Sequence, residues 1–562
     1  MNKIPKYEYP KPVPVKNRKW PDRQLKKAPV WCSVDLRDGN QALPIPMTPE
    51  KKHKYFRMLA DIGFKEIEVG FPSASQDDFD FTRKLIQENL VPKGVRISVL
   101  TQARKHLIDR TVESLAGVKE AIIHCYVATS DLHGGIVFDK TREDVKKMSV
   151  EGTKMIVKAI EKAGLKNIAY EFSPEEFTDT DIDFAVEICE AVKEAWGGCE
   201  KHNFILNLPA TVERRPPYQY ADMIEYFMGK YKYLDQTTIS VHAHNDQGCA
   251  VAATEMSLLA GADRVEGTLF GHGERTGNVD LVTLALNLHS RGIKTGLDFS
   301  DMNTVVKTVE GASGLPVHQR HPYAGELVFT AFSGSHQDAI RKGLSPSSRK
   351  KAEELFRLGW KVPYLHIDPA DLGRKYERLI RINSQSGKGG VVFILEQDFG
   401  YRPPKEMHPE IGDAVQAYAD KKKKEITSDE LNEIFKKSFI DVKGPYSLDD
   451  FHIVSELNKG ETVCAKISVT INGTGRELTG EGNGPVSAVV KALKTQKDVI
   501  GFIINDFSEQ SMGQTADATA VAYVSVKRES DGKIFYGVGI HSNIEQAALR
   551  AVFSALNRAA MN

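Results

Sequence analysis

The feature that most constrains the fold is an alternation of short apolar runs with longer amphipathic stretches between residues 31 and about 290. Such alternation is typical of βαβ units around a parallel sheet. We expect eight strands: Cys32–Leu36, Glu66–Val69, Val95–Leu100, Ala121–Val127, Asn167–Tyr170, Phe204–Leu208, Thr238–His242 and Arg264–Leu269. Eight strands in about 260 residues match a (β/α)8 barrel. An open doubly wound sheet is the alternative, but no Gly-x-Gly-x-x-Gly follows the first run.

The rest of the chain has a different pattern. Residues from about 300 to 425 hold helical stretches, and the last part contains an internal repeat of two strands and a helix. The copies are about 57 residues apart, with Gly480–Gly482 matching Gly537–Gly539. We therefore expect an arm at 1–30, a barrel at 31–305, mostly helical linker subdomains at 306–430 and an α+β domain of two ββα units at 431–562.

Composition narrows the function classes. Lysine plus arginine and aspartate plus glutamate both total 75, so the formal net charge is zero, which argues against nucleic acid or an anionic membrane as partner. No apolar run has the length of about 18–20 residues that a membrane span needs. The six cysteines are scattered without a Cys-x-x-Cys pair, and the N-terminus does not resemble a signal peptide, so we expect a cytoplasmic protein.

The strongest chemical signal is the pair His242 and His244 at the end of the seventh expected strand. Residues two apart on a strand point to the same face. In a barrel that face looks into the mouth at the C-terminal ends of the strands, where two imidazoles can hold a divalent metal. The alternative is a pair of surface or hydrogen-bonded histidines.

Two other strand ends offer further polar groups. Asp38 follows the first strand and can supply an anionic ligand, although an Asp-Gly pair is also typical of a plain turn. Arg37 beside it is a fixed cation suited to a carboxylate or a developing oxyanion. The glycine-rich loop Gly271–Asn278 follows the eighth strand, and the Asn278 amide oxygen is a candidate ligand; a plain βα turn is the alternative.

Together these motifs resemble α-isopropylmalate synthases of the longer type. The resemblance runs from about residue 30 to the C-terminus and rests on Leu36–Gln41, His242–Asp246, Gly271–Asn278, Ser333–Asp338, Val362–Leu365 and Asn383–Gly390. Two positions depart from the family pattern: His272 stands for an expected asparagine and Ala243 for an expected proline.

The resemblance implies the roles of individual residues. It makes Asp38, His242 and His244 metal ligands, with Asn278 as a fourth or water-bridged ligand, and it makes Arg37 catalytic and substrate-binding. It places Glu175, His124 and Thr211 around a 2-oxo acid and His336 and Tyr364 in the acetyl-CoA half-reaction. The purely structural alternatives are a helix N-terminal carboxylate for Glu175, a cap or turn for Thr211 and a packing role for His336.

The resemblance also implies the reaction and its partners. Acetyl-CoA, 3-methyl-2-oxobutanoate and water would give 2-isopropylmalate and CoA, with Mg²⁺ as the expected metal and Mn²⁺ or Zn²⁺ as alternatives. The C-terminal domain would sense leucine through Gly482, Gly484 and Gly539 in a homodimer; a dimerisation module without a ligand is the alternative. A homocitrate or citramalate synthase, a lyase and a non-catalytic amino-acid-binding protein are the rival functions.

Overall fold

The computed structural model describes residues 6–331, 333–376, 388–422, 426, 428–455, 462–512 and 519–562. The chain forms two compact units, one of Met1–Val328 with Ile367–Lys375 and one of Phe329–His366 with Tyr376–Asn562. Among the described residues, none of the helices combines the length and the apolar character that crossing a bilayer requires.

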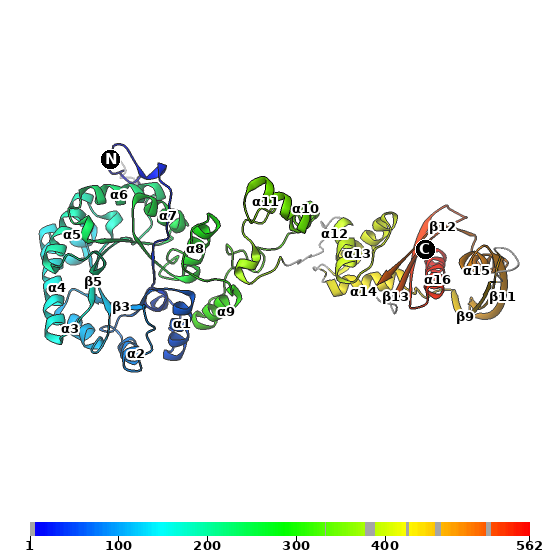
Figure 1. Cartoon of the computed structure of the whole chain (residues 1–562), viewed down its shortest axis with the longest axis horizontal. Coiled ribbons are helices and arrows are strands. Elements are labelled where there is room, and N and C mark those ends of the chain that lie inside the picture. The colour runs from blue at the N-terminus through cyan, green and yellow to red at the C-terminus, as the bar shows by residue number, and fades with distance from the viewer. Residues whose placement is uncertain are drawn as a thin grey trace. The chain divides into compact units, whose positions relative to one another are not determined.

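The first unit contains a closed barrel of eight parallel strands, as the alternation predicts (Figure 1). The strand that closes it is the first, which pairs with both the second and the eighth through Cys32. The strands are β1 (Val30–Ser33), β2 (Glu66–Gly70), β3 (Arg96–Gln102), β4 (Ala121–Ala128), β5 (Ile168–Glu175), β6 (Phe204–Ala210), β7 (Thr238–Ala243) and β8 (Arg264–Gly267).

A ring of helices surrounds the strands (Figure 1). They are α1 (Pro49–Ile62), α2 (Gln76–Gln87), α3 (Lys105–Ser114), α4 (Arg142–Ala163), α5 (Ile182–Trp196), α6 (Pro217–Lys230), α7 (Ala250–Ala260) and α8 (Leu281–Ser290). A further helix, α9 (Met302–Ser313), packs on α1, so the predicted limit of the barrel at residue 305 falls inside a helix.

The first strand is shorter at its C-terminal end than the sequence predicted. It ends at Ser33 instead of Leu36, and the chain then forms a π-helical turn, η2 (Asp35–Gly39). The buried Asp35 carboxylate accepts hydrogen bonds from Ser33 Oγ, Tyr55 Oη and the backbone N–H of Leu269, which hold this turn in place. The turn sets the backbone that carries Arg37 and Asp38.

Among its described residues, the second unit begins with five α-helices, in agreement with the helical pattern of the linker region. These are α10 (Gly334–Leu344), α11 (Pro346–Phe356), α12 (Lys388–Asp398), α13 (His408–Lys422) and α14 (Ser428–Phe439). Residues 383–387 of the motif Asn383–Gly390 lie outside the described residues.

The C-terminal repeat has one strand more per copy than the sequence predicted. Each copy is a three-stranded antiparallel sheet, in the order β11-β10-β9 or β12-β13-β14, followed by a helix. The elements are β9 (Tyr446–Ser455), β10 (Val463–Ile471), β11 (Thr474–Gly482), α15 (Pro485–Lys494), β12 (Phe502–Met512), β13 (Thr519–Arg528), β14 (Ile534–His541) and α16 (Ile544–Met561).

The strand β13 is buried on both faces. Ala522, Val524 and Val526 join the core that the two copies share with α16. Val521 and Tyr523, which alternate with them, pack in a second core with α12, α13 and α14. The helices just before the repeat therefore pack directly on its second sheet. The domain limits given by the sequence analysis stay predictions.

The glycines of the repeat have a packing role. A Cβ on Gly482 would lie 2.5 Å from the backbone N of Ala488, and one on Gly539 would lie 2.1 Å from Ala547 O. Gly484 differs, because it precedes α15 as its N-cap and a Cβ added there would have no atom within 4 Å. Close approach of strand and helix thus accounts for Gly482 and Gly539, and contact of any of the three with leucine stays a prediction.

This packing generates a stability prediction. In Gly537→Ala, the new Cβ would meet Ala555 N at 2.2 Å, so we expect α16 to open more readily, by about 1–3 kcal/mol, as overpacked sites do. Hydrogen exchange of α16 peptides in the full chain, read by mass spectrometry, measures this. The control is Gly475→Ala, where no atom lies within 4 Å of the new Cβ. Equal protection of α16 in the two variants would contradict the packing role.

Candidate active site

The interior of the barrel is filled largely by charged and polar side chains. A (β/α)8 barrel ordinarily packs branched apolar residues in layers there. In this chain the buried polar residues on the strands include Glu66, Glu68, His124, Glu171, Ser173, Asn207, His242, Arg264 and Glu266. Buried charges are tolerated only when they are paired and hydrogen-bonded, so this interior must form a network.

Arg264 is the centre of this network and has no exposed surface. Its Nε donates to Glu66, and its Nη1 and Nη2 donate to Glu171 at 3.0 and 3.2 Å. Nη1 also donates to Glu266 Oε1 at 2.9 Å. The guanidinium thereby holds Glu266 as a carboxylate, and the pKa of Glu266 lies well below its usual range, because Arg264 and the nearby histidines outweigh the effect of burial.

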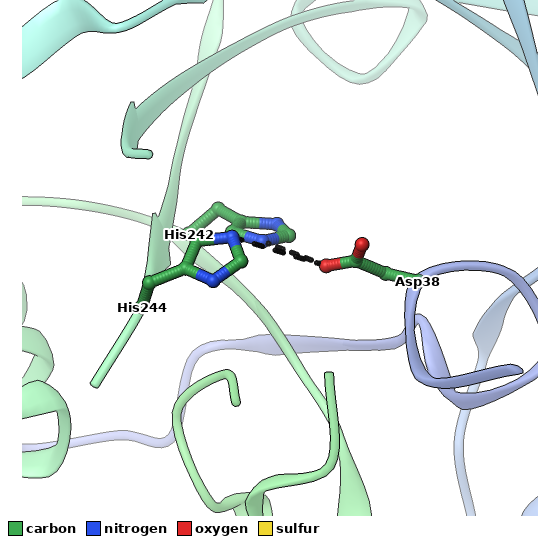
Figure 2. A group of neighbouring side chains, drawn as sticks. All are labelled: Asp38, His242 and His244. Atoms are coloured by element: carbon green, nitrogen blue, oxygen red, sulfur yellow. Dashed lines mark ion pairs between the residues drawn. The ribbon is translucent and has the colours of Figure 1, made fainter. Parts of the chain in front are cut away.

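Above this network, Asp38, His242 and His244 meet at the mouth of the barrel. Asp38 Oδ2 lies 3.4 Å from His242 Nε2 and 4.0 Å from His244 Nε2, and all three side chains are buried. Figure 2 shows the carboxylate pointing at the two rings from the opposite side of the mouth. One oxygen and two nitrogens at this spacing can bind one divalent cation.

The hydrogen bonds around the triad select the nitrogen that His242 presents. His242 Nδ1 lies 2.9 Å from Glu266 Oε2, so Nδ1 carries the proton and Nε2 faces Asp38. Burial would raise the pKa of Asp38, but Arg37 and the two imidazoles outweigh burial and hold that pKa well below its usual range. Asp38 is therefore a carboxylate and can act as an anionic ligand.

Two buried polar atoms at the site formed by Asp38, His242 and His244 show whether a cation would fit there. Asn278 Nδ2 donates to Asp38 Oδ2 at 2.8 Å, whereas Asn278 Oδ1 and His244 Nδ1 have no hydrogen-bond partner among the described residues. A buried acceptor without a partner is costly, and coordination of a cation would satisfy Asn278 Oδ1. The donor set of carboxylate, imidazoles and amide oxygen therefore fits a divalent metal.

A second group of possible ligands, His124, Glu171 and Glu266, does not fit as well. His124 Nδ1 contacts Glu68 at 2.6 Å and its Nε2 contacts Ser173 Oγ at 2.7 Å. Both glutamates are already bonded to Arg264. The guanidinium of Arg264 therefore supplies the positive charge that a metal ion would otherwise bring to this group.

Arg37 and His124 are joined by one buried carboxylate. Arg37 Nε donates to Glu68, whose other oxygen contacts His124, and Arg37 Nη1 lies 3.0 Å from Asp38 Oδ1. Burial lowers the pKa of His124, but Glu171 and Glu68 outweigh burial and raise it overall. A fixed positive charge therefore lies beside the triad.

These side chains line one pocket of about 210 Å³. Its lining residues are Arg37, Asp38, Gln41, Phe71, Leu100, His124, Tyr126, Ser173, Glu175, Asn207, Pro209, Thr211, His242, His244, Glu274 and Arg275. The pocket thus brings together every predicted barrel residue except Asn278, which contacts Asp38. Glu175 is the last residue of β5 and not a helix N-terminal carboxylate, and burial raises its pKa.

The two residues predicted for the acetyl-CoA half-reaction belong to the second unit. His336 and Tyr364 stack on each other, with ring centroids 4.0 Å apart. Both side chains are exposed, and Tyr364 has a positive φ of 61°. The contact brings the two predicted residues together, and their joint role in the reaction stays a prediction.

Two residues that the sequence analysis missed orient the predicted ones. Glu68 binds Arg37 and His124, and Glu266 orients His242. A signal was present in the sequence, because Glu66-Ile67-Glu68 and Arg264-Val265-Glu266 place charges two residues apart on expected strands. Residues at that spacing share a face, and in a barrel that face is the interior.

Comparisons with known proteins agree with this geometry. Residues 28–309 match the family model described as HMGL-like, residues 326–396 match the alpha-isopropylmalate synthase post-catalytic domain, and residues 425–560 match the LeuA allosteric (dimerisation) domain. The chain is 48% identical over 556 residues to a 2-isopropylmalate synthase of Clostridium acetobutylicum, with 98% of each chain covered. It is 48% identical over 561 residues to that of Thermobifida fusca, with 99% and 97% covered.

The chain belongs to the 2-isopropylmalate synthase family. Among solved structures, a hydroxymethylglutaryl-CoA lyase of Pseudomonas aeruginosa matches with a TM-score of 0.42 and 20% identity, over 52% of this chain and 96% of that one. The two departures from the family pattern leave the ligand set intact. His272 contributes its backbone oxygen to a hydrogen bond with Thr268, and Ala243 is buried between the two histidines.

The hydrogen bond between Glu266 and His242 generates a prediction. In Glu266→Gln, His242 loses the carboxylate that fixes its tautomer, so we expect divalent metal affinity to fall by about 10–100-fold. Titration of the protein with Mn²⁺, followed by electron paramagnetic resonance, measures this affinity. Glu255→Gln is the control, because Glu255 on α7 pairs with Arg291, which follows α8, and neither residue lines the pocket. An unchanged Mn²⁺ affinity in Glu266→Gln would contradict the orienting role.

Proposed function

We propose that the chain catalyses the condensation of acetyl-CoA with 3-methyl-2-oxobutanoate and water to give 2-isopropylmalate and CoA. The observation that carries the proposal is the meeting of Asp38, His242 and His244 in the barrel mouth of a chain that aligns with 2-isopropylmalate synthases over nearly its full length. The methyl carbon of the acetyl group loses a proton and attacks C2 of the oxo acid. Hydrolysis of the thioester then releases CoA.

Asp38, His242 and His244, with Asn278, would hold the metal, for which we propose Mg²⁺, with Mn²⁺ and Zn²⁺ as alternatives. When bound there, a divalent cation supplies Lewis-acid polarisation of the oxo group. Arg37 provides a fixed positive charge next to Asp38, where the carbonyl oxygen of the acid becomes an alkoxide. A donor in such a position contributes about 2.7–4 kcal/mol to lowering the barrier.

The remaining lining of the pocket suits a small branched oxo acid. Phe71, Leu100 and Pro209 provide apolar surface for an isopropyl group, and Thr211 provides a polar contact for the carboxylate end. His124 also lines the pocket, where its raised pKa favours a positive charge near that carboxylate, although its ring nitrogens bond Glu68 and Ser173. We assign the proton transfer from the acetyl methyl to His336 with Tyr364, which the stacking of the two rings supports. Glu175 completes the catalytic set, and its raised pKa is consistent with proton transfer.

We further propose that the C-terminal domain binds leucine and lowers turnover, and that the chain acts as a homodimer. The match of residues 425–560 to an allosteric dimerisation domain supports both points. Gly484 has open space beside the first turn of α15, where backbone N–H groups can bind a carboxylate.

An assay of free CoA tests the proposal. The protein is given acetyl-CoA with each of 3-methyl-2-oxobutanoate, pyruvate and 2-oxoglutarate, with and without a chelator. We expect release with 3-methyl-2-oxobutanoate, loss of release with chelator, and a lower rate when leucine is added. Faster release with pyruvate or 2-oxoglutarate would favour a citramalate or homocitrate synthase, and no release with any acid would contradict an enzymatic role.

A further inference from the structure

A single arginine at the rim of the pocket joins three loops. Arg275 lies in the loop after β8, and its Nε donates to Asp246 Oδ1 at 2.7 Å. Its Nη2 donates to Asp246 Oδ2 at 3.1 Å and to the backbone oxygen of Thr211 at 2.6 Å. Asp246 lies in the loop after β7 and Thr211 in the loop after β6. One guanidinium therefore spans the C-terminal ends of three consecutive strands.

The acceptors of Arg275 are themselves fixed. Asp246 Oδ2 also accepts the backbone N–H of Glu213 at 2.9 Å. Glu213 Oε2 in turn accepts the backbone N–H groups of Gln247 at 2.5 Å and of Cys249 at 3.3 Å. The loops after β6 and β7 are thus bonded to each other, and Arg275 attaches the loop after β8 to both.

The loop that carries Arg275 is tightly turned. Arg275 has a positive φ of 56°, and a Cβ on Gly277 would lie 1.8 Å from Gly271 O. Gly277 O accepts the backbone N–H of Asn245 at 3.0 Å, and Asn278 follows directly with its bond to Asp38. A loop in this conformation needs fixed points on its neighbours, and the fork of Arg275 supplies one.

We propose that Arg275 is a positioning residue that holds Thr211 and Asn278 in the geometry that the oxo acid and the metal require. The proposal rests on the proposed function for the role of Thr211. Arginine is suited to this task because its planar fork donates to two acceptors in fixed directions, which a lysine ammonium cannot reproduce. Charge alone would be preserved by lysine, so the fork and the charge can be tested separately.

The test uses the full-length variants Arg275→Gln and Arg275→Lys. Both are expected to raise the KM for 3-methyl-2-oxobutanoate and to weaken Mn²⁺ binding without substrate, each by about tenfold, the lower end of what loss of a supporting partner costs. The KM for acetyl-CoA and kcat are expected to change less than about threefold, because the affected groups bind the acid and the metal. The matched controls are Arg291→Gln and Arg291→Lys, since Arg291 pairs with Glu255 at 2.8 Å away from the pocket lining.

Three other outcomes overturn the proposal. If both values in Arg275→Gln stay within twofold of the wild type, the arginine positions nothing. If Arg275→Lys keeps the KM for 3-methyl-2-oxobutanoate and the Mn²⁺ affinity at their wild-type values, the charge of Arg275 matters and its planar fork does not. If kcat falls while KM and Mn²⁺ affinity hold, Arg275 acts on the reaction itself. A wild type that releases no CoA refutes the proposed function, and Mn²⁺ affinity then decides the role of Arg275 alone.

Discussion

The interaction on which the rest of the barrel depends is the buried contact of Arg264 with Glu66, Glu171 and Glu266. Without the guanidinium, Glu66 would still pair with Arg96 and Glu266 with His242, but Glu171 would lose its salt bridge. Removal of one partner of a buried pair costs about 3–5 kcal/mol. Burial, with Glu266 nearby, already raises the pKa of Glu171 to about 8. The interior of the barrel thus holds a network of charged side chains in place of ordinary apolar packing. This network costs free energy of folding, and we infer that it is kept because it orients the residues at the barrel mouth.

The charge network orients the side chains at the mouth of the barrel. Glu266, kept ionised by Arg264, accepts a hydrogen bond from the Nδ1–H of His242, and His242 Nε2 then faces Asp38. On the other side of the mouth, Glu68 orients both Arg37 and His124. The strands hold these side chains rigidly, while the loops above carry Thr211, Asn278 and Arg275. Rigid strands set the reactive groups, and the loops complete the contacts with ligands.

The sequence predicted the barrel well because apolar runs and amphipathic helices alternate with little ambiguity. It misplaced the end of the first strand, since the turn there depends on contacts of Asp35 with Tyr55 and Leu269, which are distant in sequence. It missed β9 and β12 because these edge strands contain acidic residues, such as Asp449 and Asp506, that obscure an apolar pattern.

The site was predicted in part for the same kind of reason. His242 and His244 lie at the end of β7, and Asp38 lies in the turn that follows β1. Parallel strands bring their C-terminal ends together, so the meeting of these residues follows from the fold. The sequence analysis missed Glu68 and Glu266 because a glutamate within a strand usually indicates a surface position. Only the closed barrel shows that these two side chains lie in its interior. Close packing on α15 and α16 accounts for Gly482 and Gly539 but not for Gly484, and contact of these glycines with a ligand stays a prediction.

The central claim is that Asp38, His242 and His244 bind one divalent cation next to the oxo acid. Pulsed electron paramagnetic resonance of the Mn²⁺-loaded protein tests it most directly. The account predicts ¹⁴N couplings from two imidazoles, one of which disappears in His242→Ala and one in His244→Ala, while His289→Ala, at an exposed position, keeps both. It also predicts a ¹³C coupling when labelled 3-methyl-2-oxobutanoate is added. Bound Mn²⁺ without any imidazole coupling would contradict the claim.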